Sequence, residues 1–320
     1  MEQEICVSLY PSASLARTLS EKPDISIEAE YGSLVVEGRL YTAAHHQADG
    51  PYCCKVSPAP CNNTGIPILA SGGVVMLSHL DLDSVGGALR TFPEFADLFD
   101  NRNADFWVLA EFVDLNGPHR LDESLASEAT KDLLYAYWAW SQENRGPPLT
   151  ERDEKGKVVP MVRNVTDHIR ATGEMLRALL IDSSSALLEA GNTFRSQQEK
   201  LNETSFVESV DGVSIRVSDA FVNAFYNSPD SETIADAVVG FNTKSGAVTV
   251  SLAVPIEGIS CREIVQQVFL DRGPTGELEA GGRDVIAGSP RGRRCTFEEF
   301  SKVIDLTRKM LREGPPKAGV

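Results

Sequence analysis

One imidazole and two carboxylates alternate in the segment His79-Leu80-Asp81-Leu82-Asp83. The apolar run 73–77 precedes this segment and is rich in β-branched residues, which predicts a strand. In extended backbone, side chains at alternate positions point the same way, so all three groups would converge. Converging nitrogen and hard oxygen donors suit a divalent cation. Mn²⁺ is the preferred candidate, and Mg²⁺ and Zn²⁺ are the alternatives. The sequence therefore predicts a metal site where this strand ends.

A purely structural interpretation of the same residues stays open. Asp83 or Ser84 could cap the helix that follows. His79 could be a hydrogen-bonded core histidine, and Asp81 an exposed loop carboxylate. We favour the metal site because ligand crevices in α/β sheets form at the ends of strands.

A second apolar run, 106–113, also reads as a strand and ends in an acid and an imidazole, Asp114 and His119. In a parallel sheet the ends of both strands would lie on one edge, so Asp114 could join the metal ligands. His119 could then protonate a leaving group. The alternative for Asp114 is an Asx turn, since Asn116-Gly117-Pro118 follows.

Three further residues are weighed for the same site. Asp167 opens a predicted helix, where it is either a metal ligand or a first-turn acid that the helix dipole favours. The adjacent His45 and His46 are alternatives to His119 as the acid, or surface residues without a role.

The charge distribution points to a small anionic substrate. The formal net charge is −16, which disfavours binding to long nucleic acid. The segment 281–320 nevertheless carries an excess of Lys and Arg. Side-chain and backbone donors in this segment could hold phosphate or carboxylate oxygens. The residues that carry these donors are Gly281, Gly282, Arg283, Ser289 and Arg291. The alternative is that the segment is only a solvated loop.

The chain reads as α/β in two domains. Residues 1–200 are expected to form a parallel-sheet metal-binding domain with a β-rich N-terminal segment, including a hairpin of 25–30 with 33–38, and a helical connector. Residues 201–320 are expected to form a smaller α/β substrate-binding domain. No apolar run is long enough to span a bilayer, so no membrane partner is expected. The N-terminus lacks a signal-peptide pattern, which favours a cytoplasmic location, and a homodimer is left open.

Over roughly residues 67–313 the chain resembles the DHH phosphoesterase superfamily. His79-Leu80-Asp81-Leu82-Asp83 with Gly86 and Gly87 resembles that family's first motif, and Asp114 resembles its second metal-binding strand. Gly281-Gly282-Arg283 stands where the family's C-terminal domain carries Gly-Gly-His. Two departures are plain: no Asp-His-His triplet is present, and Arg283 replaces a histidine that could act as acid or base.

The resemblance implies a metal-dependent hydrolase that acts on a small anionic substrate in a cleft between two domains. The leading hypothesis for its reaction is phosphoester hydrolysis. The cation would lower the pKa of a bound water. The Arg283 replacement motivates an alternative, a metal-dependent C–N or amide hydrolase or a lyase. The missing triplet motivates another, a non-catalytic ligand-binding protein of the same fold.

Overall fold

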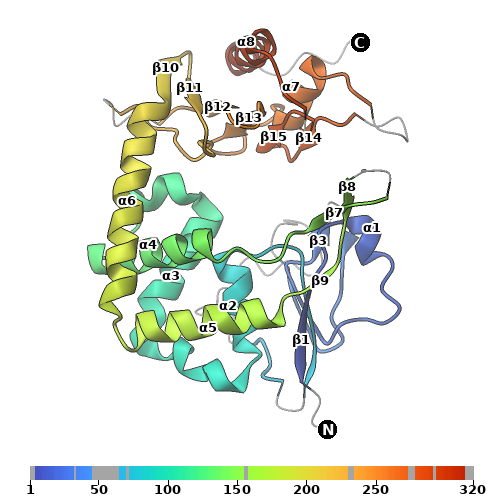
Figure 1. Ribbon diagram of the computed structural model, residues 1–320, viewed down its shortest axis with the longest axis vertical. Coiled ribbons are helices and arrows are strands. Elements are labelled where there is room, and N and C mark those ends of the chain that lie inside the picture. Colours follow the sequence, from blue (N-terminus) through green and yellow to red (C-terminus); the bar gives the residue numbers. More distant parts are fainter. Residues whose placement is uncertain are drawn as a thin grey trace. The chain divides into compact units, whose positions relative to one another are not determined.

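The computed structural model describes residues 4–31, 34–44, 65–69, 72–154, 158–229, 234–272, 278–290 and 293–313 (Figure 1). The chain divides into two compact units, of which the first holds Met1–Leu115 and Glu123–Arg195 and the second holds Asn116–Asp122 and Ser196–Val320. The division falls within the long helix α6 (Ser185–Ser205).

The first unit is built on a mixed sheet. Its described strands lie in the order β5 (Tyr41–Ala43), β2 (Ile25–Ile27), β6 (Gly73–Leu77), β1 (Ile5–Leu9) and β9 (Arg163–Asn164). The first four strands run parallel, and β9 pairs antiparallel with β1. The α/β class predicted from the sequence is therefore confirmed.

Helices cover one face of this sheet. Val7, Val75 and Leu77 are fully buried on that face, where α5 (Thr166–Leu180) contacts β1 and α2 (Leu82–Arg90) contacts β2. The Val7 N–H donates to Thr166 Oγ1 at 2.8 Å, which ties the start of α5 to the sheet.

The expected strand at 106–113 is wrong. This segment lies in helix α3 (Ala104–Asn116). Its buried side chains, Phe106, Trp107, Leu109 and Ala110, follow the spacing of one helical face, and Trp107 Nε1 donates to the Leu98 carbonyl at 2.9 Å. A short apolar run can form either a strand or a buried helix, and here the packing of the indole selects the helix.

The antiparallel hairpin in the N-terminal segment is shorter than the predicted pairing of 25–30 with 33–38. Among the described residues of 25–38, the antiparallel pair consists of β3 (Glu30–Tyr31) and β4 (Leu34–Val35), whereas β2 enters the parallel sheet. The remaining described elements of the first unit are a second hairpin, two helices, the first part of α6 and two 3₁₀ segments: β7 (Thr150–Arg152), β8 (Val158–Pro160), α1 (Ala13–Ala16), α4 (Glu128–Glu143), η1 (Pro93–Phe99) and η2 (Asn101–Asn103).

The second unit carries a sheet whose described strands lie in the order β10 (Phe206–Val210), β11 (Val213–Ser218), β12 (Ala237–Asn242), β13 (Val248–Leu252), β15 (Ile286–Gly288) and β14 (Gly281–Gly282). Among these described strands, only β11 and β12 are parallel neighbours, and β12 and β13 form an antiparallel hairpin. Helices α7 (Cys261–Val268) and α8 (Phe297–Glu313) pack on this sheet (Figure 1).

A serine and a threonine N-cap start helices α7 and α8 of the second unit. Ser260 Oγ accepts from the Glu263 N–H, and Thr296 Oγ1 accepts from the Glu299 N–H. Within the described part of the chain, no helix combines the length and the apolar character that a bilayer crossing needs.

Candidate metal centre

Two parallel strands deliver acidic and imidazole groups to one edge of the first sheet. Strands β2 and β6 are paired so that Ile27 lies opposite Leu77, the last residue of each strand. Glu28 follows β2 directly, and Ser78-His79 follow β6. Because the strands are parallel, both segments leave the sheet on the same side.

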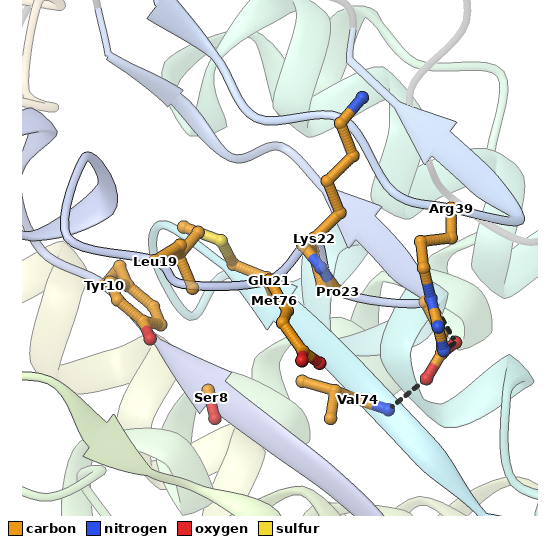
Figure 2. Close-up of a pocket in the computed structure, with 10 residues that line it drawn as sticks. Ser8, Tyr10, Leu19, Glu21, Lys22, Pro23, Arg39, Val74 and Met76 are labelled. Atoms are coloured by element: carbon orange, nitrogen blue, oxygen red, sulfur yellow. Dashed lines mark hydrogen bonds and ion pairs between the residues drawn. The ribbon is translucent and has the colours of Figure 1, made fainter.

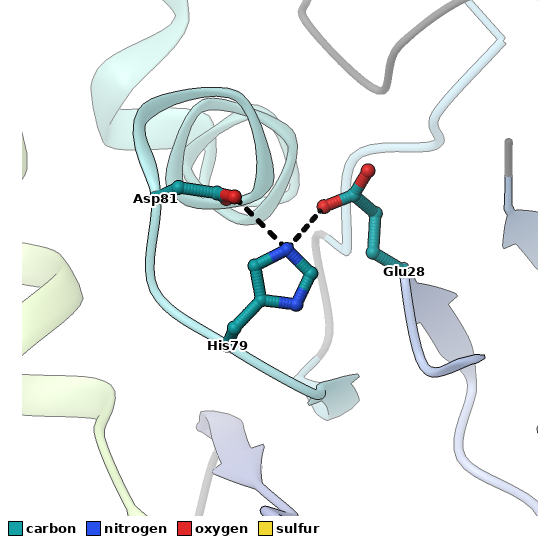
Figure 3. Close-up of side chains that lie close together, drawn as sticks. All are labelled: Glu28, His79 and Asp81. Atoms are coloured by element: carbon teal, nitrogen blue, oxygen red, sulfur yellow. Dashed lines mark ion pairs between the residues drawn. The ribbon is translucent and has the colours of Figure 1, made fainter. Parts of the chain in front are cut away.

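His79 stands between two carboxylates (Figure 3). Its Nε2 atom lies 2.9 Å from Glu28 Oε2 and 2.9 Å from Asp81 Oδ2. The Glu28 side chain is 0% exposed, whereas those of His79 and Asp81 are 30% and 43% exposed. This first group thus has a buried side formed by Glu28 and an open side formed by Asp81.

A second group shares Glu28 with the first. Ligand atoms of Glu28, Asp83 and Asp114 all lie within 4.8 Å of one another. Asp83 is buried in the first turn of α2, and Asp114 comes from the last turn of α3. The structure therefore brings four sequence-predicted ligands to Glu28, although Asp114 arrives from a helix and not from a strand.

The expected alternation of His79, Asp81 and Asp83 along an extended segment is wrong. Asp81 is the N-cap of α2, where its Oδ1 accepts from the Ser84 N–H at 3.4 Å while Ser84 Oγ accepts from the Asp81 N–H at 3.2 Å. The other carboxylate oxygen of Asp81 faces His79. One oxygen of Asp81 thus caps the helix while the other contacts His79, and the helix places Asp83 in the second group.

Glu28 holds an unusual backbone conformation. Its φ of 49° lies in the left-handed region, which non-glycine residues rarely adopt and which costs about 1–2 kcal/mol. Its N–H donates to the Ala43 carbonyl of β5 at 2.7 Å. Strain of this kind at a buried acidic residue is typical of functional sites.

The electrostatics of the two groups follow from their crowding. Burial disfavours the charged imidazole of His79, but the hydrogen bonds and charges of Asp81 and Glu28 outweigh it and raise the pKa of His79. Burial, followed by the charges of Asp81, Glu28 and Asp114, raises the pKa of Asp83. Partial burial acts against ionisation of Asp81, yet its contact with His79 holds the Asp81 pKa below its usual value.

The donor set fits a divalent cation. Carboxylates held within 4.8 Å of one another repel when ionised, and a cation between them removes that repulsion. One imidazole nitrogen with carboxylate oxygens matches Mn²⁺, Zn²⁺ or Mg²⁺. Glu28, His79 and Asp81 could hold one ion, and Glu28, Asp83 and Asp114 a second.

Other predicted residues lie elsewhere or outside the described ranges. Asp167 is exposed in the first turn of α5 and belongs to neither group of ligand atoms among the described residues. His119 lies in the 3₁₀ segment η3 (Pro118–Glu123), which belongs to the second unit, with its ring centroid 4.3 Å from that of Tyr226. His45, His46 and Arg291 lie outside the described residues.

The predicted glycine loop is an edge strand of the second unit. Gly281 and Gly282 form β14, which pairs with β15, and Arg283 after it is exposed. Ser289 is bound to β13, since its N–H donates to the Val248 carbonyl at 2.9 Å and its Oγ accepts from the Val248 N–H at 3.1 Å. Anion binding by these four residues stays a prediction.

Gly282 has a structural role that a substitution can measure. Its φ is 153°, and a Cβ there would lie 2.4 Å from the Ile286 carbonyl oxygen. We expect Gly282→Ala to lower the free energy of unfolding by about 2–4 kcal/mol, from backbone strain and the clash together. Urea denaturation of the full chain checks this.

Gly281→Ala is the matched control, because the nearest atom to its Cβ is Gln266 Nε2 at 3.9 Å. This variant should change the free energy of unfolding by less than about 1 kcal/mol. Equal stability of both variants would show that β14 does not need Gly282.

Sequence reasoning missed Glu28. Residues 25–30 alternate, which favours a hairpin arm over a strand of the parallel sheet. The available signal was an acid directly after the buried run Ile25–Ile27, the same pattern that identified His79 after its own strand. Only the parallel pairing of β2 with β6 gives that acid its partner.

A separate pocket lies on the opposite face of the same sheet (Figure 2). Ser8, Val74 and Met76 line it and alternate along β1 and β6 with the residues buried under the helices. Three of its charged groups are paired within the protein: Lys22 pairs with Glu37, and Asp24 pairs with Arg39 and accepts from the Val74 N–H at 2.8 Å. We assign no chemistry to this pocket.

Comparisons with known proteins leave the family open. No family model matches the sequence, and no curated protein matches it. Among solved structures, an exopolyphosphatase-related protein from Bacteroides fragilis aligns with 87% of this chain and 66% of its own, at 11% identity and a TM-score of 0.32. An uncharacterized protein from Helicobacter pylori G27 aligns with 71% of this chain and 51% of its own, at 16% identity and a TM-score of 0.20.

The chain thus spans about two thirds of one of these structures and about half of the other. Likenesses at this level do not show a family. The functional conclusion therefore depends on the geometry around Glu28.

Proposed function

We propose that this protein is a metal-dependent hydrolase that acts on a small anionic substrate. The leading hypothesis for its reaction is phosphoester hydrolysis. The observation that supports the proposal is the buried Glu28 carboxylate, which belongs to both ligand groups at the end of two parallel strands. A bound divalent ion would supply a water of lowered pKa and would neutralise charge on a phosphoryl oxygen. Mn²⁺ is the preferred candidate for this ion.

The protein's own residues have distinct parts in this proposal. Glu28 and Asp83 form the buried side of the site and exclude water there. His79 and Asp81 form its half-exposed side, from which a substrate can approach. Arg283 is the exposed basic side chain that we assign to the substrate anion.

The proton donor to the leaving group is assigned to one of three histidines. The candidates are His119, His45 and His46, because an imidazole is a common proton donor in hydrolysis. Replacing each by asparagine should identify the donor as the variant that loses turnover of a poor leaving group but keeps turnover of an activated aryl ester.

An activity screen of the full chain tests the proposal. The protein is treated with EDTA, dialysed, and assayed with phosphodiesters, phosphomonoesters and acylated amines, with and without Mn²⁺. We expect hydrolysis of a phosphoester that vanishes after EDTA treatment and returns with Mn²⁺. Turnover of acylated amines alone would show that the protein is an amide hydrolase and not a phosphoesterase.

If no substrate is hydrolysed in this screen, a measurement of Mn²⁺ binding distinguishes two explanations. If Mn²⁺ binds tightly but no substrate class is hydrolysed, the chain is a binding protein. If Mn²⁺ does not bind, the metal site itself is wrong.

A further inference from the structure

Ser78 connects the two residues that face each other in the first ligand group. Its Oγ donates to the Glu28 backbone carbonyl and lies 2.7 Å from His79 Nδ1. A carbonyl oxygen can only accept, so the single hydroxyl proton of Ser78 is used on Glu28. The contact with His79 must therefore be donated by the imidazole, which places a proton on Nδ1.

This proton leaves the ring lone pair on the other nitrogen, which faces the two carboxylates. In a neutral imidazole with Nδ1–H, Nε2 carries the lone pair. That atom lies 2.9 Å from an oxygen of Glu28 and 2.9 Å from an oxygen of Asp81. A lone pair facing two carboxylates is repulsive unless a proton or a metal ion lies between them.

We propose that Ser78 is a positioning residue, which fixes the Nδ1–H tautomer of His79 and joins that ligand to Glu28 so that both present their donor atoms to one metal ion. The inference rests on the metal site of the proposed function. Partners of this kind orient metal-binding histidines in many proteins, and their loss typically weakens metal binding by about 10–100-fold.

The bond to the Glu28 carbonyl adds a second constraint. Glu28 has left-handed backbone, and its carbonyl accepts from the Glu30 N–H at 2.8 Å as well as from Ser78. Ser78 thus helps to hold the strained turn that directs the Glu28 side chain into the site. Removing the hydroxyl loosens both ligands together.

Calorimetric titration of the metal-free full chain with Mn²⁺ tests the inference. We expect Ser78→Ala to bind Mn²⁺ about 10–100-fold more weakly than the unsubstituted protein. Ser78→Thr keeps the hydroxyl and should bind within about threefold of it. Ser260→Ala is the matched control, because it also removes a hydrogen-bonded serine hydroxyl, at the start of α7, and should leave the affinity unchanged.

A tautomer measurement separates positioning from general loosening. Long-range ¹⁵N–¹H NMR spectra of the Zn²⁺-loaded protein should show His79 with a protonated Nδ1 and a metal-bound Nε2. Ser78→Ala should lose this pattern, and Ser78→Thr should restore it even if the alanine variant folds poorly.

Two results would overturn the inference. One is an unchanged Mn²⁺ affinity in Ser78→Ala, and the other is a His79 ring bound through Nδ1. Failure of the unsubstituted protein to bind Mn²⁺ would instead contradict the proposed function itself, so the two failures are distinguishable.

Discussion

Replacing Glu28 by glutamine is expected to weaken Mn²⁺ binding by at least about 100-fold, which corresponds to roughly 2.7 kcal/mol of binding free energy. Glu28 is common to both ligand groups, so one neutral amide removes a ligand charge from each. Glutamine has nearly the same size, and it relieves the repulsion between Glu28 and Asp83 in the metal-free state. The metal-free variant should therefore stay folded.

Thermal unfolding measures both halves of this expectation. At a free Mn²⁺ concentration of about 100 times its Kd, the unsubstituted protein gains roughly 2.7 kcal/mol, which raises the Tm of a unit of this size by about 5–10 °C. Glu28→Gln should keep its metal-free Tm and lose this rise. Glu21→Gln, in the pocket on the opposite face of the sheet, is the matched control and should retain the rise.

A Glu28→Gln variant that still binds Mn²⁺ as tightly as the unsubstituted protein would remove Glu28 from the site. The two groups would then be an ordinary cluster of buried acids. The proposed function would lose its principal support.

Two substitutions of Asp81 separate its metal role from its capping role. Asp81→Asn keeps an oxygen for the Ser84 N–H, because asparagine caps helices about as well as aspartate. Loss of the negative charge should nevertheless lower kcat/KM for the Mn²⁺-dependent reaction by at least about 100-fold. Asp81→Ala should lose activity equally and should also lower the free energy of unfolding by about 1 kcal/mol, the usual value of an N-cap.

Steady-state kinetics and urea denaturation of both variants check this pair. Ser127→Ala provides the stability control, since it removes the N-cap of α4 without touching either ligand group. Full activity in Asp81→Asn would assign Asp81 to capping alone. Equal stability of the two Asp81 variants would show instead that the cap contributes nothing.

The sequence identified which residues gather at this edge of the sheet better than it predicted their geometry. His79, Asp81 and Asp83 were recognisable because a polar cluster after a β-branched run is unusual. Their alternation suggested extended backbone, but the capping box at Asp81 and Ser84 starts a helix two residues earlier than that geometry allows. Local hydrogen bonds decided this point, and they are weak signals in a sequence that also fits a strand.

Asp114 was predicted at the end of a strand, but it lies in the last turn of helix α3. The run 106–113 has no clear period, since apolar side chains occur on all sides, and a buried helix and a buried strand look alike in that case. Its fit beside Glu28 depends on how α3 packs, which is tertiary information. Glu28 itself was out of reach for the same reason, because its role requires β2 to pair with β6, a strand about fifty residues further along the chain.

Anomalous X-ray diffraction from crystals grown with Mn²⁺, recorded at the manganese absorption edge, tests the central claim most directly. The account predicts an anomalous peak within coordination distance of Glu28, shared with His79 and Asp81, with Asp83 and Asp114, or with both pairs. Mn²⁺ absent from these side chains at a saturating concentration, with the carboxylates still clustered, would contradict it.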